Sequence, residues 1–206
     1  MHNFLTAPLP GKTAVLRDLE ILAVDLETTG LDPARDRILS IGTVLIKRLG
    51  IELSSGWHQL VTVDQEIPES SAVIHQITDD QAAGGIPIEM AIQSLLQRLQ
   101  GKVMLVHGAQ VEKNFLNRVC EQSYGISLLV PMIDTQALAY RQFVRRDLPI
   151  KEGDLRLFNL RERFQLPRYK AHNALSDALA TAELFLAMTA DMCPDGQCRI
   201  KNLLLP

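Results

Sequence analysis

Two carboxylates stand inside an otherwise apolar segment, residues 21–30 (ILAVDLETTG). Asp25 and Glu27 are two residues apart, so on a β-strand their side chains point to the same side. Ile21 and Ala23 share that side, and the residues between them point to the other. Two like charges held side by side repel each other unless a positive group lies between them. The pair therefore predicts a bound metal cation.

Two further acids occur where helices are expected to begin. Glu112 falls in the first turn of a helix that follows VMLVHG, and Asp177 lies early in the last long helix, with His172 in the loop before it. Taken alone, each acid is explained by the favourable dipole at a helix start. A strand end offers Asp25 and Glu27 no comparable dipole.

Together the four carboxylates come from three elements that we expect to meet at one end of a sheet. Oxygen ligands of this kind suit hard divalent cations, so the predicted cofactors are two ions of Mg²⁺ or Mn²⁺. A pair of such ions can stabilise the attacking and leaving oxygens of a phosphoryl displacement.

The elements that must position these residues follow from hydrophobic periodicity and turn signals. The first third predicts three strands in an antiparallel meander, and later segments alternate between helix and strand. This order indicates a mixed sheet covered by helices in one domain spanning residues 1–206, with a core at about 20–190 and short terminal extensions. Strands are expected at 21–28, 37–49, 51–63, 103–108 and 129–134, and helices at 70–78, 90–100, 109–125, 135–144, 155–166 and 174–190.

Composition narrows the setting. The chain has 206 residues, of which 47% are hydrophobic. Its formal charge is -3, so its net charge does not indicate a nucleic-acid partner. No apolar run is long enough for a signal peptide or a membrane span. Three cysteines predict neither a disulfide framework nor a zinc site. We therefore expect a cytoplasmic protein with no membrane partner.

Charge is nevertheless uneven along the chain. The segment 141–170 carries nine basic residues against four acidic ones. A solvated helical face is the simpler interpretation of such a segment. Because it leads into the His172 loop, the alternative is that Arg145 and Arg146 border a groove for single-stranded nucleic acid.

Five segments then carry a resemblance to a known family: VDLETTGLDP, IHQITDD, VHGAQVEKNFL, IDTQALA and HNALSDALATAELF. Their order and spacing resemble the DEDDh (DnaQ-like) 3'–5' exonucleases, which include the proofreading epsilon subunit of DNA polymerase III and ribonuclease T. The resemblance spans residues 21–188. It implies an α/β, ribonuclease H-like fold with a five-stranded mixed sheet flanked by helices. It also implies hydrolysis of DNA or RNA from single-stranded 3' ends to nucleoside 5'-monophosphates.

The resemblance also assigns roles to single residues. Asp25 would bind both metals and Glu27 one of them, Asp177 would complete the site, and Glu112 stands where the family usually has aspartate. His172 matches the general base, which takes a proton from the attacking water. Residues that resemble the nucleotide-binding segment are Thr28, Thr29, Gly30 and Leu31.

Departures from the family pattern leave alternatives open. His107 and Gly108 stand where the family often has His-Asn, so His107 is either a substrate contact or a structural histidine. His75 matches the family's IHxIT element, and a structural role is favoured for it over a catalytic one. The favoured function is an active exonuclease, and the alternative is a non-catalytic nucleic-acid-binding or polymerase-associated module. Candidate partners besides nucleic-acid ends are a DNA polymerase and a second copy of the chain.

Overall fold

The structure is a computed structural model that describes residues 8–205. The first seven residues, part of the N-terminal stretch for which the sequence predicts no signal peptide, lie outside that range. A five-stranded mixed sheet forms the centre of the molecule, with strand order β3-β2-β1-β4-β5. The strands are β1 (Glu20–Thr28), β2 (Ile38–Lys47), β3 (Gly50–Leu60), β4 (Val103–Val106) and β5 (Met132–Asp134).

The direction of the strands fixes where the candidate residues meet. β1, β2 and β3 form the predicted antiparallel meander, whereas β4 and β5 run parallel to β1. The carboxyl ends of β1, β4 and β5 therefore lie at the same edge of the sheet. In α/β proteins, ligands bind at such an edge.

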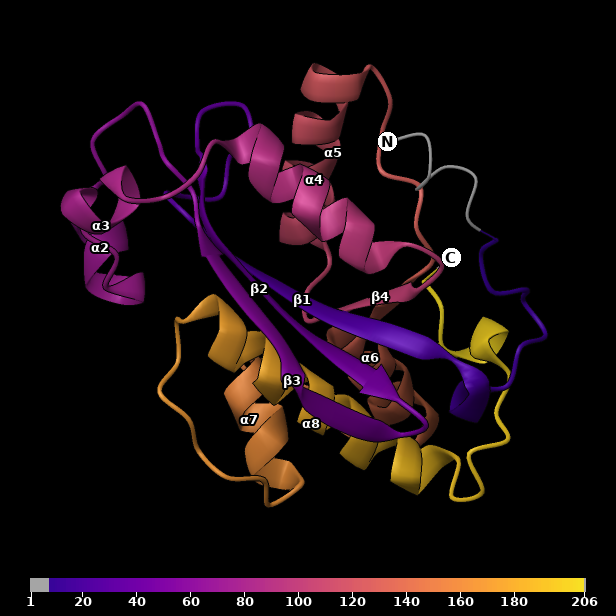
Figure 1. Ribbon diagram of the computed structural model, residues 1–206. Helices are drawn as coiled ribbons and strands as arrows, with labels where there is room; N and C mark the ends of the chain where they lie inside the picture. The colour runs from indigo at the N-terminus through magenta and orange to yellow at the C-terminus, as the bar shows by residue number, and fades with distance from the viewer. Residues whose placement is uncertain (1–7, 206) are drawn as a thin grey trace.

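Helices cover both faces of the sheet (Figure 1). α4 (Ile88–Leu99) and α5 (Gln110–Tyr124) cover one face. α6 (Thr135–Arg145), α7 (Leu157–Arg163) and α8 (Ala174–Met192) cover the other, while α2 (Glu69–His75) and α3 (Asp79–Ala83) lie beyond the carboxyl end of β1. The predicted five-stranded mixed sheet flanked by helices is confirmed.

Alternation along β1 divides the apolar core in two. Ile21 and Ala23 pack with α6, α7 and α8, whereas Leu22 and Val24 pack with α4 and α5. This is the division expected from side chains that alternate across a strand. Asp25 and Glu27 therefore continue the row that faces α8.

The two terminal extensions pack against this core more closely than the sequence indicated. Leu16, Ile200 and Leu203 are buried in the core beneath α8. A bridge between Ile133 and Leu204 covers the outer side of β5, which protects an otherwise open sheet edge from pairing with other chains.

Some predicted boundaries and one cysteine prediction are wrong. The predicted strand at 129–134 is shorter in the structure: residues 129–131 form no strand, and β5 begins at Met132. Cys193 and Cys198 form a disulfide bridge, and only Cys120 is a free buried thiol. The Pro-Asp-Gly turn that the sequence places between the two cysteines brings their sulfur atoms together. Among the described residues, no helix has the length and apolarity needed to cross a bilayer.

Candidate active site

The carboxyl end of β1 carries Asp25 and Glu27. Asp25 pairs with Gly42 of β2, and the register between the two strands shifts between Glu27 and Thr28. Such irregularities bend a strand and change the direction of its side chains, and they are common beside active sites. Beyond the shift, Thr28 still pairs with Ile38, and β1 ends there.

Gly42 explains how α8 comes close enough to contribute a third acid. A Cβ atom on Gly42 would lie 2.0 Å from the carbonyl carbon of Ala174, the first residue of α8. The missing side chain therefore lets the first turn of α8 lie directly on β2, next to Asp25. Asn173 caps this turn by accepting a hydrogen bond from the amide of Ser176.

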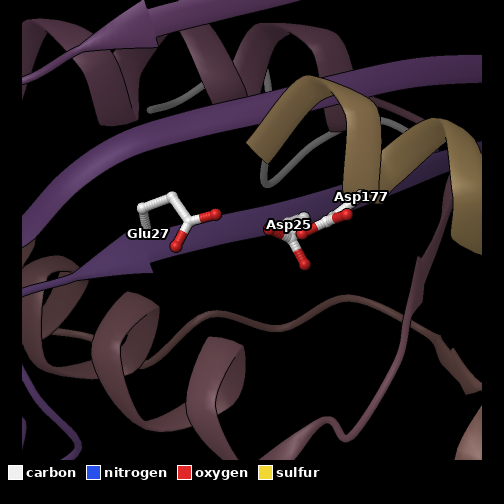
Figure 2. A group of neighbouring side chains, drawn as sticks. All are labelled: Asp25, Glu27 and Asp177. Atoms are coloured by element: carbon white, nitrogen blue, oxygen red, sulfur yellow. The ribbon is translucent and has the colours of Figure 1, made fainter. Parts of the chain in front are cut away.

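Asp25, Glu27 and Asp177 converge as the sequence predicts. Each offers one carboxylate oxygen, and these oxygens all lie within 4.8 Å of one another. Figure 2 shows Asp25 and Asp177 facing each other from β1 and α8, with Glu27 further along the strand. One oxygen of Asp177 accepts the amide of His172 at 2.8 Å, whereas its Oδ1 is buried with no hydrogen-bond partner among the described residues.

Glu112 approaches from the opposite face of the sheet. It lies in the first turn of α5, is buried, and its Oε2 has no hydrogen-bond partner among the described residues. It does not belong to the group of three acids within 4.8 Å of one another. Its charge nevertheless helps to raise the pKa of Asp25, so the fourth predicted acid faces the same site.

The electrostatics of the site favour a cation. Burial, with the charges of Glu112, Asp177 and Glu27, raises the pKa of Asp25 well above its usual range. Burial, together with the charge of Asp177, raises the pKa of Glu27 to about 7. Burial and the charge of Asp134 raise the pKa of Glu112 to about 8. Unpaired carboxylates buried together either hold protons or bind a cation, and these residues fit a divalent metal.

Asp134 is an acid of this region that the sequence reasoning did not single out. Its Oδ1 accepts the amides of Gly108 and Gln136, and its Oδ2 accepts the amide of Ala109. Because backbone donors occupy both oxygens, Asp134 links the turn before α5 to the start of α6. The signal was available in the sequence: an aspartate at the end of a buried strand and directly before a helix is a common helix cap.

His172 lies in the loop between α7 and α8, and its side chain is exposed. Its backbone has φ 66°, in the left-handed region that disfavours residues other than glycine. The loop touches α2, since Lys170 Nζ donates to the Gln76 side chain at 2.6 Å. The backbone amide of His172 contacts Asp177, while its imidazole is exposed.

The segment after β1 is anchored through His75. The amide of Ile77 donates to His75 Nδ1, which leaves the proton on Nε2, and that nitrogen bonds the hydroxyl of Ser71 at 2.7 Å. Ser71 in turn donates to the carbonyl of Thr28. His75 therefore has the structural environment expected for it, and its contacts fix the position of Thr28.

Residues 28–31 divide into inward-facing and outward-facing groups. The Thr29 hydroxyl is buried and bonds Asp36 and the amide of Arg37, so this hydroxyl already has partners within the chain. Gly30 has no room for a side chain, because a Cβ would lie 2.4 Å from Asp36. Leu31, three residues after the end of β1, is 79% exposed.

His107 is held from the inside of the molecule. Its Nδ1 bonds the hydroxyl of Thr135 at 2.8 Å, and that hydroxyl donates to the carbonyl of Val106. Burial lowers the pKa of His107. Of the two interpretations left open by the sequence, these contacts favour a structural histidine that joins β4 to α6.

Arg145 and Arg146 lie away from the carboxylates, and their place along a groove for single-stranded nucleic acid stays a prediction. Arg146 pairs with Asp191 at 2.7 Å, near the end of α8, whereas Asp177 lies in its first turn. At 1.5 Å per residue, α8 separates these positions by roughly 20 Å. The adjacent Arg145 ends α6, whose beginning faces the site.

Comparisons with known proteins agree with this arrangement. A family model described as Exonuclease matches residues 22–185. The chain is 32% identical to DNA polymerase III subunit epsilon of Treponema pallidum over 186 residues, which cover 90% of this chain and 84% of that protein. It is 30% identical to the PolC-type DNA polymerase III of Thermotoga maritima, but it spans only 13% of that much longer protein.

Solved structures share the fold. Exonuclease X, solved in complex with 5' overhanging duplex DNA, matches with a TM-score of 0.66 and 23% identity over 89% of this chain and 96% of the other. The nuclease domain of 3'hExo, a DEDDh family member bound to rAMP, matches with a TM-score of 0.71 and 18% identity over 87% and 96%. The predicted fold is confirmed, and the family model covers residues 22–185, so this chain is an exonuclease domain and belongs to the Exonuclease family.

Proposed function

We propose that this chain is a metal-dependent 3'–5' exonuclease that hydrolyses single-stranded DNA or RNA ends to nucleoside 5'-monophosphates. The observation that carries the proposal is the convergence of Asp25, Glu27 and Asp177 within 4.8 Å, beside an exposed His172. A structural neighbour that binds rAMP supports a nucleoside monophosphate as the product.

The two cations are proposed to be Mg²⁺ or Mn²⁺, held by Asp25, Glu27, Asp177 and Glu112. The buried, unpartnered oxygens of Glu112 and Asp177 support this ligand set. When bound, the ions supply the Lewis acidity that lowers the pKa of water and stabilises charge on the leaving oxygen.

The protein side chains then have separate tasks. His172 accepts a proton from the water that attacks the terminal phosphorus, and its exposed position in a loop suits contact with substrate. The bond that breaks joins this phosphorus to the 3'-oxygen of the preceding nucleotide. The product therefore keeps its 5'-phosphate.

Substrate is proposed to lie along residues 28–31. Leu31, at 79% exposure, offers an apolar surface to the terminal base, and stacking or apolar contact with a base tolerates every sequence. The backbone of Thr28 and Gly30 lies beside it, and the bond between Ser71 and Thr28 supports this backbone. His107, which bonds Thr135, is proposed to support the site from within rather than to touch substrate.

Relatives that are DNA polymerases or polymerase subunits support a DNA polymerase as a partner. We infer that the chain trims the 3' ends that such a polymerase extends. Polymerase association and nuclease activity can be tested independently, because the proposed catalytic residues lie within this chain.

The test uses 5'-labelled single-stranded DNA and RNA oligomers with Mg²⁺, Mn²⁺ or EDTA. The proposal predicts a ladder that shortens stepwise from the 3' end in either metal and no cleavage in EDTA. A circular single strand is the control and is expected to remain intact. Cleavage of the circle, or a parent chain that is inert in both metals, would contradict the exonuclease.

A further inference from the structure

An arginine is fully buried close to the loop that carries His172. Arg161, on α7, is only 1% exposed. A guanidinium in a protein interior is costly unless its charge is paired and its donors find acceptors. Its Nη1 donates to the carbonyl of Ala180 at 2.7 Å, and its Nη2 donates to the carbonyl of Pro167 and to Glu183 Oε2, each at 2.8 Å.

Glu183 and Tyr169 complete the cluster. The second oxygen of Glu183 accepts the Tyr169 hydroxyl at 2.7 Å, so the carboxylate bridges tyrosine and arginine. The Arg161 guanidinium lies over the Tyr169 ring, with its Cζ 4.7 Å from the ring centre, which adds a cation–π contact. The Arg161–Glu183–Tyr169 cluster therefore joins α7, α8 and the loop between them.

This cluster holds the loop at Tyr169. Beyond it, Lys170 bonds the Gln76 side chain, and the amide of His172 donates to Asp177 Oδ2 at 2.8 Å. Between Tyr169 and His172 only two residues intervene. The backbone of His172 has φ 66°, in the left-handed region that is unfavourable for a residue with a Cβ atom, and such strain persists only where the surroundings hold it.

We propose that the Arg161–Glu183–Tyr169 cluster positions His172 over the carboxylates, so that its three members are positioning residues for the reaction. The inference rests on the proposed function, because that function gives His172 its task. Docking of α7 does not require the charged cluster, since Leu160 already packs in the apolar core. Buried ion pairs are in general poor sources of stability, which favours a positional role.

The experiment replaces Tyr169, which is only half-buried and can change without exposing the core. Tyr169→Ala removes both the hydroxyl and the ring, whereas Tyr169→Phe keeps the ring over Arg161. The matched control is Tyr140→Ala, because Tyr140 is 52% exposed on α6. Each variant is compared in single-turnover assays on a single-stranded oligomer with Mn²⁺.

The rate at saturating substrate is expected to fall on the order of 10²-fold in Tyr169→Ala, the effect of misplacing a catalytic group by about 1 Å. KM should stay near that of the parent, Tyr169→Phe should recover most of the rate, and Tyr140→Ala should match the parent. In a His172→Ala background, Tyr169→Ala should have no further effect, because both changes act through the same group. An equal loss in both backgrounds would overturn the proposal.

A second measurement does not depend on activity. Hydrogen exchange of the His172 amide should become faster in Tyr169→Ala, while the amides of β1 and α5 exchange as in the parent. Unchanged exchange at His172 would also overturn the proposal. If the parent hydrolyses no oligomer, the proposed function fails, and the exchange measurement still decides whether the cluster holds the loop.

Discussion

At the scale of single residues, Glu112 has the most specific consequence for metal choice. Glutamate has the charge of the aspartate that the resemblance leads us to expect at this position but carries one more methylene, and Glu112 lies outside the group of three acids within 4.8 Å. Mg²⁺ demands near-ideal octahedral geometry at short distances, so a displaced ligand weakens its binding more than that of a more tolerant cation. We expect the parent to be at least as active with Mn²⁺ as with Mg²⁺.

Two substitutions of Glu112 test this expectation by single-turnover rates in both metals. Glu112→Asp should remain active and gain most with Mg²⁺. The single-turnover rate of Glu112→Ala should fall at least about 100-fold, which is the upper range for the loss of a residue that only supports a metal ligand. The variant should still fold, because the substitution removes a buried carboxylate whose pKa is raised. Glu121→Ala, an exposed acid of the same helix, is the control. Parent-like rates in Glu112→Ala would show that this residue binds no metal.

At the scale of elements, the contact between β2 and α8 places Asp177. Gly42→Ala inserts a Cβ atom 2.0 Å from the backbone of Ala174, so the first turn of α8 must shift. Overpacking of this kind costs about 1–3 kcal/mol of unfolding free energy, and it should weaken Mn²⁺ binding by moving Asp177. Urea denaturation in EDTA and calorimetric titration with Mn²⁺ measure the two effects.

Gly50→Ala serves as the control for this change. A Cβ atom added to Gly50 would lie 3.6 Å from the carbonyl oxygen of Lys47, which is an ordinary contact. Gly50 lies in the hairpin between β2 and β3. The control should bind Mn²⁺ like the parent. If Gly42→Ala binds Mn²⁺ with the affinity of the parent, the position of α8 does not determine metal binding.

The elements are also where prediction from sequence succeeded and where it stopped. Alternation placed Asp25 and Glu27 on the face of β1 that packs on α8, because side-chain direction in a strand follows from local order. Asp134 bonding Gly108, and Arg161 bonding Glu183, join residues 26 and 22 positions apart. Hydrophobic periodicity along the sequence does not predict contacts between residues so far apart. Charge counting likewise does not give the position of Arg146, which the length of α6 carries away from the carboxylates.

At the scale of the whole molecule, the buried acids link stability to pH and metal. In the unfolded chain Glu27 and Glu112 ionise near pH 4.5, but folding raises their pKa values to about 7 and about 8. Between these limits the folded state binds more protons than the unfolded state, so the free energy of unfolding falls as pH rises. The metal-free protein should therefore have a lower Tm at pH 8 than at pH 5.

Divalent cations should reverse this loss, because they bind the ionised carboxylates of the folded state only. Thermal unfolding in EDTA and in excess Mn²⁺ at both pH values measures the effect. The increase in Tm caused by Mn²⁺ should be larger at pH 8 than at pH 5, and Asp25→Asn should show a smaller increase. An increase that is equal at both pH values would indicate that the cation binds elsewhere.

The central claim is that water, activated beside these carboxylates, attacks the terminal phosphorus. Hydrolysis of a single-stranded oligomer in H₂¹⁸O, followed by mass spectrometry of the released nucleotides, tests this claim most directly. We predict nucleoside 5'-monophosphates that each carry one ¹⁸O in the phosphate, and no release with EDTA. Nucleoside 3'-phosphates, or 5'-monophosphates without the label, would contradict the account.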